Sequence, residues 1–431
     1  MSVAGTRELV DRIWSRDPTV WTGRDEAQWL GWLDEPLRMR ERADEILRFA
    51  AEARPGRVCL LGMGGSSLAP EVMRRTFGVD HFAVLDTTHP TAIRRVEPEE
   101  GMLFVASSKS GSTIETRSQL DYFLERGAEA VVITDPGSPL EELGLRVFHG
   151  EPTIGGRYSA LSTFGIVPAA LMGIDVRRLL ERADEMREAC RLEEGNPGLE
   201  LGLALGSGWR EGKDKVETAG DFGLWVEQLI AESTGKQGKG LIPVRIGHGD
   251  DVQEHEVRLT DPYELGQEFF RWEFATAVAG SILEVNPFDQ PDVQAAKDKT
   301  MEVLERGDDP PLEDEGDLDK LLAGAREGDY VAVQAFIDPA REPELQPLVD
   351  RLARTGRPVA VGLGPRYLHS TGQLHKGGPN TGIFVQVVDD LGEELPIPGR
   401  PFGFRRLIAA QAAGDFEALR ERGRRVVRMH L

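Results

Sequence analysis

The chain has 431 residues, of which 40% are hydrophobic and 29% are charged, a composition typical of soluble globular proteins. One hydrophobic core rarely extends over so many residues, so we expect two domains. The formal net charge of −22 argues against nucleic acid or an anionic membrane surface as a partner, and an anionic ligand would need a local basic pocket.

The sequence gives no strong signal for a leader peptide, a membrane span, or a disulfide or zinc site. The first residues, MSVAGTRELVDRIW, include acids and no long apolar segment, so they do not indicate a signal peptide. No run of about 18 uninterrupted apolar residues predicts a membrane span. Cys59 and Cys190 have no CxxC partner, which disfavours a disulfide framework or a zinc site. We therefore expect a cytoplasmic protein.

A helical segment opens the chain, and strands then alternate with helices. Residues 1–53 carry apolar side chains at roughly helical spacing, which predicts a helical cap on the first domain. Such alternation predicts a parallel, doubly wound α/β sheet whose ligands bind at the carboxyl ends of the strands. The predicted strands of this part are RVCLLG (57–62), HFAVLD (81–86), MLFVAS (102–107) and EAVVITD (129–135).

Alternation continues in the second half. A helix is predicted over 222–233, and SPLEEL (138–143) and the Asp261, Pro262 and Glu264 group each predict a helix start. We place the first domain at 54–197 and the second at 198–431, with an exposed acidic connector at 306–320. The predicted strands here are VETAG (216–220), VRLTD (257–261), YVAVQAFI (330–337) and RPVAVGLG (357–364).

The stretch VASSKSGSTIET (105–116) has the composition of a turn that holds a phosphate. Ser112 and Glu115 have capping-box spacing, so we predict that a helix starts at Ser112. A helix start offers free N–H groups and a partial positive charge. A plain serine-rich turn would be the simpler interpretation of this stretch in isolation. The possible ligand groups are Ser108, Lys109, Ser110, Ser112 and Thr113.

Two glycine turns offer further binding groups. GMGGSSLAPE (62–71) matches a dinucleotide fingerprint only in part, because Ser67 stands at the third glycine position. Gly64 and Gly65 would let a ligand approach the backbone and Ser66 could donate a hydroxyl, although a tight strand–helix turn explains the motif equally well. IGGRYSALS (154–162) places Arg157 after paired glycines, over a cleft or simply on the surface.

Candidate acid–base groups occur in three later stretches. Glu232 lies near the end of an apolar helix, where its charged form would be disfavoured, which suits a general base; a solvated helix-end glutamate is the alternative. Gln290 and Lys297 would stand about two turns apart on one helix face. His369 and His375, without a carboxylate in ligand register, make a poor metal site, so a catalytic histidine or a polar loop remains.

Together these stretches resemble the phosphoglucose isomerase family over nearly all of the chain from about residue 57. The chain looks closest to the isomerase part of bacterial transaldolase–isomerase fusions. The resemblance implies two SIS-type, flavodoxin-like lobes, each a mainly parallel sheet flanked by helices, usually in a homodimer. It implies interconversion of glucose 6-phosphate and fructose 6-phosphate through an enediolate, in glycolysis and gluconeogenesis, without metal or other cofactor. A functional link to a separate transaldolase is a further hypothesis.

The same resemblance implies roles for individual residues. Glu232 would be the base, Arg157 would stabilise the enediolate, and Lys297 with a histidine would help to open the ring. The family histidine normally lies between the glutamate and lysine motifs, but here LHSTGQ follows Lys297, so the role is assigned to His369 as a relocated segment. The implied substrate-binding residues are Gly65, Ser66, Ser108, Lys109, Ser110, Ser112, Thr113, Gly156, Gln228 and Gln290.

Three alternatives stay open at this point. Mannose 6-phosphate could be a second substrate. The lobes could form a sugar-phosphate-binding regulator without catalysis, which would not need Glu232 and Lys297. A nicotinamide-dependent oxidoreductase is disfavoured by the broken glycine fingerprint and by the unexplained serine loop.

Overall fold

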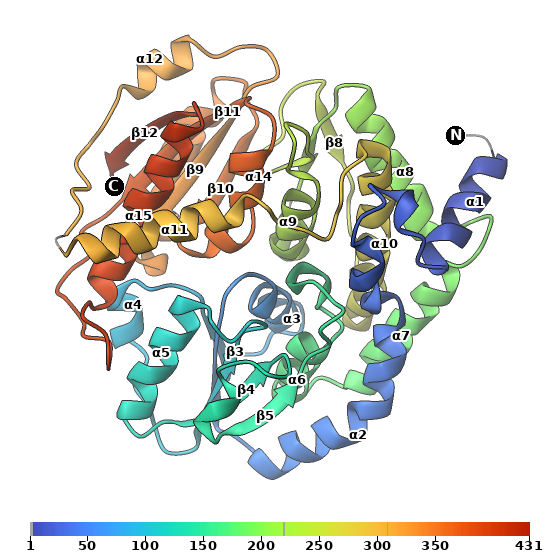
Figure 1. The fold of residues 1–431 in the computed structure, drawn as a ribbon, viewed down its shortest axis with the longest axis horizontal. Coiled ribbons are helices and arrows are strands. Elements are labelled where there is room, and N and C mark those ends of the chain that lie inside the picture. Colours follow the sequence, from blue (N-terminus) through green and yellow to red (C-terminus); the bar gives the residue numbers. More distant parts are fainter. Residues whose placement is uncertain (1–2, 219, 308) are drawn as a thin grey trace.

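The computed structural model describes residues 3–218, 220–307 and 309–431. Figure 1 shows one group of strands with its helices in the lower half of the view and a second group at the upper left, with long helices at the right. All strand pairs within the three sheets are parallel, and helices flank them. The predicted α/β class is therefore confirmed.

The N-terminal segment is helical, as predicted. Helix α1 spans Val3–Trp14 and α2 spans Glu35–Ala53, with three short 3₁₀ helices between them. α2 packs against α6 (Thr163–Leu171) and α7 (Val176–Ala189), which belong to the chain beyond the first sheet.

The first sheet has the strand order β2-β1-β3-β4-β5. This 2-1-3-4-5 order is that of flavodoxin-like sheets, in which ligands bind where the order reverses, beside the first and third strands. The last strand is short and was not predicted. The strands are β1 (Arg57–Gly62), β2 (Phe82–Leu85), β3 (Met102–Ser107), β4 (Glu129–Thr134) and β5 (Arg146–His149).

Two helix starts in this part differ from the prediction. Helix α5 spans Ile114–Glu125, and its N-cap, Thr113, makes no side-chain capping bond, so the predicted start at Ser112 was wrong. The carboxylate of Glu115 faces the second half of the chain instead of closing a capping box. SPLEEL forms only a 3₁₀ turn at Glu141–Leu143. The other helices are α3 (Leu68–Thr76) and α4 (Pro90–Arg94).

The second sheet repeats the pattern, with the strand order β10-β9-β11-β12. The first two strands in the chain were predicted, and the last two were not. The strands are β9 (Tyr330–Phe336), β10 (Val359–Leu363), β11 (Gly382–Val388) and β12 (Arg425–His430). The helices of this part are α11 (Val293–Arg306), α12 (Leu318–Ala323), α13 (Gln346–Ala353), α14 (Gly372–Gly377) and α15 (Phe404–Glu421).

A three-stranded sheet, β7-β6-β8, lies between the two larger ones in the chain. The strand predicted at 257–261 was wrong, because the nearest strand, β8, lies earlier in the chain. Of the strand predicted at 216–220, residue 219 lies outside the described residues. Asp261 and Glu264 do form a capping box before the following helix, as predicted. The elements are β6 (Lys215–Glu217), β7 (Ile242–Val244), β8 (Val252–Glu254), α8 (Pro197–Arg210), α9 (Gly220–Thr234) and α10 (Leu265–Leu283).

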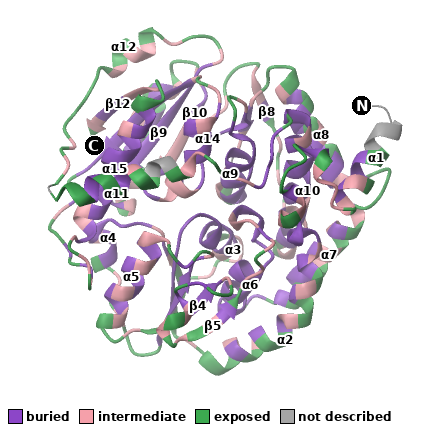
Figure 2. Ribbon diagram, in the orientation of Figure 1, coloured by how far each residue is buried: buried purple, intermediate pink, exposed green. Residues whose placement is uncertain are grey.

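Buried residues gather on the strands and on the helices next to them, while α2 and α12 show exposed faces (Figure 2). α10 packs against α7, α8 and α9 and joins the N-terminal helices in one large apolar cluster. None of the described helices combines the length and the apolar composition needed to cross a bilayer.

The core around β3 yields a stability prediction. Phe104 is fully buried on this central strand, and its ring stacks on Phe123 of α5 with centroids 4.5 Å apart. Phe104→Ala should lower the free energy of unfolding by about 3–5 kcal/mol, because it leaves a cavity in a packed core. Urea denaturation measures the change. Leu192→Ala is the control, since Leu192 is 52% exposed, and should stay within about 0.5 kcal/mol of the parent. Equal losses in the two variants would contradict the packing account.

Candidate functional site

Three of the predicted motifs meet at the glycine turn that follows the carboxyl end of β1. The turn after β1 contains Gly64 and Gly65, and a Cβ at Gly65 would lie 2.0 Å from the carbonyl oxygen of Gly156. Gly64 has a φ of +55°, and a Cβ there would lie 2.5 Å from the carbonyl oxygen of His369. Only glycine fits such close backbone contacts, so the glycine turn brings the Arg157 motif and the His369 segment together.

Glu232 lies in this region, near the end of α9. The residue is 9% exposed, and its Oε1 lies 3.1 Å from Nη1 of Arg157. Its Oε2 accepts a hydrogen bond from Nε2 of Gln228 (3.0 Å), which also donates to the carbonyl oxygen of His369 (2.9 Å). One amide group therefore links the candidate base to the histidine segment.

Arg157 is held by the loop 286–290. Its side chain is 1% exposed. Nη2 donates to the carbonyl oxygens of Pro287 (3.0 Å) and Asp289 (2.7 Å), and Nη1 donates to Oε1 of Gln290 (3.0 Å). The surface position that was the alternative for this arginine is excluded, and Gln290 lies at its guanidinium.

Lys236 is a second cation on the same loop. Its Nζ donates to the carbonyl oxygens of Asn286 (2.7 Å) and Asp289 (2.6 Å) and to Oδ1 of Asp289 (2.6 Å). Burial, with help from the charge of Arg157 and against the pull of Asp289, lowers the pKa of Lys236 to about 8. The backbone carbonyl groups of the loop 286–290 thus accept hydrogen bonds from two buried cations, Arg157 and Lys236.

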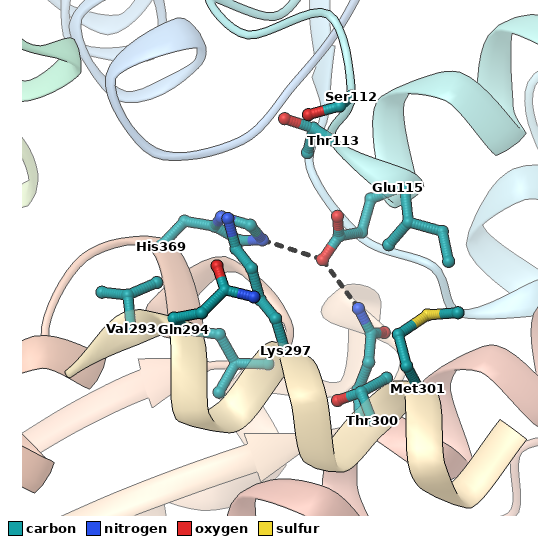
Figure 3. A pocket seen from close by; sticks show the side chains of 12 residues that line it. Ser112, Thr113, Glu115, Val293, Gln294, Lys297, Thr300, Met301 and His369 are labelled. Carbon is teal, nitrogen blue, oxygen red and sulfur yellow. Dashed lines mark hydrogen bonds and ion pairs between the residues drawn. The ribbon is translucent and has the colours of Figure 1, made fainter. Parts of the chain in front are cut away.

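His369 faces a cavity of about 260 Å³ between the two halves of the chain (Figure 3). Its Nε2 lies 2.8 Å from Oε1 of Glu115, and the same oxygen accepts a hydrogen bond from Nε2 of Gln411 (2.7 Å). In Figure 3, Lys297 of α11 faces the same space as His369, with Ser112 and Thr113 on the opposite wall.

The surroundings of Glu115 favour its ionised form. Burial alone would raise the pKa of Glu115, but the facing His369 and, to a lesser extent, Lys297 hold it below its usual value. Neither Glu115 nor Gln411 was predicted as a site residue. The sequence did hold one signal, since Glu115, Gln119 and Tyr122 fall on one helical face, and all three are buried. No local pattern indicated Gln411.

The residues of the serine loop, 108–113, differ in whether they face the cavity. Ser112 and Thr113 line the cavity, and Ser108 is buried with its Oγ 2.9 Å from Oγ1 of Thr113. Ser110 pairs with Ser112 (2.9 Å between hydroxyl oxygens). Lys109 is turned away, because its Nζ pairs with Asp135 and donates to the carbonyl oxygen of Glu151 (3.2 Å).

Lys297 is exposed and lines the cavity. Within residues 3–218, 220–307 and 309–431, no hydrogen bond or ion pair engages its ammonium group. The start of its helix is fixed by the fully buried Gln373, which accepts from the backbone N–H of Asp292 (2.8 Å). Gln373 also donates to Oδ2 of Asp292 (2.8 Å) and to the carbonyl oxygen of Gly235 (2.9 Å). It thereby ties the histidine segment to both α9 and α11.

Apart from Ser108, Lys109 and Ser110, the predicted site residues form two groups. Ser112, Thr113, Lys297 and His369 line the cavity, whereas Glu232 and its neighbours lie beyond the His369 backbone and do not line it. The described part of the chain holds no group of three or more His, Cys, Asp or Glu side chains placed to bind a metal ion. The second group consists of Gly65, Ser66, Gly156, Arg157, Gln228, Glu232 and Gln290.

No family model matches the chain. A glucose-6-phosphate isomerase of Gloeothece citriformis is 34% identical over 272 residues, which cover 53% of this chain and 49% of that protein. A glucose-6-phosphate isomerase of Carboxydothermus hydrogenoformans is 32% identical over 249 residues, 48% of this chain and 53% of that protein. The chain thus spans about half the length of the curated relatives it matches.

Among solved structures, a glucose-6-phosphate isomerase from Chlamydia trachomatis aligns with a TM-score of 0.58 at 17% identity. The alignment covers 70% of this chain and 84% of that one, and it shows a shared fold. These matches confirm the resemblance to the phosphoglucose isomerase family. The relation to transaldolase fusions stays a prediction.

The lowered pKa of Lys236 yields a prediction on pH and stability. Between about pH 8 and the ordinary lysine pKa of 10.5, the unfolded chain binds more protons at this lysine than the folded chain, so stability should rise with pH. Across that pH range the free energy of unfolding should rise less in Lys236→Met than in the parent protein, by roughly 2–3 kcal/mol at most. Urea denaturation at about pH 7.5 and about pH 10 measures it.

The matched control for this experiment is Lys239→Met, three residues further along the chain, where Lys239 donates to the carbonyl oxygen of Leu283 (2.8 Å). This control should keep the rise in stability seen in the parent protein. If the Lys236→Met variant and the parent gain the same stability between the two pH values, the assignment to Lys236 is wrong.

Proposed function

We propose that the chain, a relative of the glucose-6-phosphate isomerases, is itself an aldose–ketose isomerase that interconverts glucose 6-phosphate and fructose 6-phosphate. The observation that carries this proposal is the buried Glu232 carboxylate, paired with Arg157 and joined through Gln228 to the His369 segment. The names and the fold of the related proteins support it. A cytoplasmic location and a place in glycolysis and gluconeogenesis are part of the same proposal.

The phosphate group would bind at the wall formed by Ser112 and Thr113. Hydroxyl groups and the start of α5 supply donors there, and Lys297 supplies a positive charge across the cavity. The resemblance assigned Lys109 to this task, but its pairing with Asp135 leaves Lys297 better placed. Binding energy from the phosphate, remote from the reacting carbons, would position the sugar.

Ring opening would occur beside His369. The reaction moves a proton from the anomeric hydroxyl to the ring oxygen, so it needs an acid and a base near the ring. Glu115 accepts from one ring nitrogen of His369, fixes the ring orientation and stabilises an imidazolium, which can donate from its other nitrogen. Lys297 faces the same space and would assist.

Isomerisation would then take place at Glu232. The carboxylate would remove the proton from C2 and return it to C1, and Arg157 would offset the negative charge on the enediolate oxygens. Its guanidinium is already fixed by backbone carbonyl groups, so little reorganisation is needed as charge develops. This step requires C1 and C2 of the open-chain sugar to reach Glu232 beyond the His369 backbone, outside the cavity that Ser112 lines.

The base assignment is tested by Glu232→Gln. The amide keeps the shape of the side chain but cannot take the proton, so turnover should fall by about 100-fold to 10,000-fold. A coupled assay with fructose 6-phosphate in the presence of EDTA measures this. Glu45→Gln, on the exposed face of α2, is the control and should match the parent protein. Turnover near the parent rate in Glu232→Gln would exclude this carboxylate as the base.

The positioning of His369 is tested by Glu115→Gln. Loss of the carboxylate removes the charge that stabilises the imidazolium, so kcat should fall by about tenfold, a part of what acid–base catalysis contributes, while KM changes little. Steady-state kinetics with glucose 6-phosphate measure kcat and KM separately. Glu125→Gln, at the exposed end of the same helix, should leave both constants unchanged. An unaltered kcat in Glu115→Gln would contradict this role.

A further inference from the structure

We propose that a groove beside the serine loop is a second anion site, centred on Arg400, which binds the phosphate group of a small metabolite. The groove has a volume of about 680 Å³ and lies between the serine loop after β3 and the turn at 398–400 that precedes α15. Its polar lining comes from Ser112, Arg117, Asp121 and Arg400. Only its expected effect on catalysis rests on the proposed function.

Arg400 pairs with no carboxylate in the described parts of the chain. Its turn is closed by a hydrogen bond from its own N–H to the carbonyl oxygen of Ile397 (3.2 Å), so its Cα is fixed at the groove. The side chain is half-buried and its Nε is shielded from solvent, yet no hydrogen bond or ion pair to it is found in the described parts of the chain. Its guanidinium carbon lies 5.8 Å from the ring centre of Phe402.

With a net charge of −22, most arginines near carboxylates are paired; Arg405, five residues after Arg400, pairs with Asp309. The shielded Nε is out of reach of an external anion, but the two Nη groups are not among the shielded atoms, and Arg400 lines the groove. A guanidinium presents a planar set of donors that matches phosphate oxygens. An anion in the groove could therefore accept from these two groups.

The charges in the groove fit one phosphate group. Nε of Arg117 donates to both carboxylate oxygens of Asp121 (2.8 and 3.0 Å), so these two side chains offset each other. Arg400 supplies the remaining positive charge, and the hydroxyl of Ser112 supplies a further donor. A polyanion would meet no matching set of cations here, whereas a single phosphate monoester or free phosphate would.

Ser112 connects this groove with the sugar cavity, because it lines both. Two anions that both contacted Ser112 would repel each other, because charges are screened only beyond about 10 Å at 0.1 M salt. An anion in the groove would also compete for the Ser112 hydroxyl. Occupancy of the groove should therefore weaken sugar phosphate binding, which makes the groove a regulatory site for the proposed isomerase.

Binding is tested first, with inorganic phosphate as the probe and with chloride keeping the ionic strength constant. Isothermal titration calorimetry of the parent protein should show two classes of site, and Arg400→Gln should lose one of them. Arg405→Gln, whose arginine is paired, should keep both. Identical isotherms for the parent and Arg400→Gln would overturn the proposal, whatever reaction the chain catalyses.

Kinetics then test the coupling. Phosphate should raise the apparent KM of the parent enzyme more steeply than in proportion to its concentration, because it binds both in the sugar cavity and in the groove and weakens sugar phosphate binding from each. In Arg400→Gln the apparent KM should rise linearly with the phosphate concentration, with kcat and KM in the absence of phosphate unchanged. The same steep dependence in both proteins would overturn the regulatory role. An inactive parent protein would refute the proposed function and leave the binding result standing.

Discussion

The ion pair between Glu232 and Arg157 is the interaction on which the site depends. A buried charge is costly unless it is paired and hydrogen-bonded, and here the arginine has both a carboxylate and the carbonyl groups of the loop 286–290. Lys236 binds the same loop, and both cations donate to the carbonyl oxygen of Asp289. The loop thus fixes Arg157, which would stabilise an enediolate. Arg157 in turn fixes Glu232, the carboxylate that would form the enediolate.

The His369 segment gives the site its second constraint. Its backbone touches the glycine turn at Gly64, its histidine pairs with Glu115 of the first sheet's helices, and Gln373 joins it to α9 and α11. A segment that lies far along the chain therefore sets the relative positions of the phosphate wall, the candidate base and Lys297. This placement agrees with a relocated histidine, whose role stays a prediction.

Local patterns predicted much of the fold, and long-range contacts decided the rest. The apolar runs at β1, β3, β4 and β9 were identified. The short strand β5 and the charged strand β12 were not, because their stability comes from neighbouring strands. The strand β11 was missed although its sequence, GIFVQVV, is an apolar run. Glu115 has the spacing of a capping residue, yet its partners are 254 and 296 residues away. Lys109 lies in a phosphate-loop motif, yet Asp135 engages it. The domain boundaries, the homodimer and the transaldolase link stay predictions.

The central claim is that Glu232 carries a proton between two carbons of a sugar phosphate. Incorporation of solvent deuterium at C2 of glucose 6-phosphate, followed by proton NMR in D2O, observes that transfer directly. The account predicts incorporation with the parent protein and none above background with Glu232→Gln at the same protein concentration. Incorporation by the variant at the parent rate would contradict it.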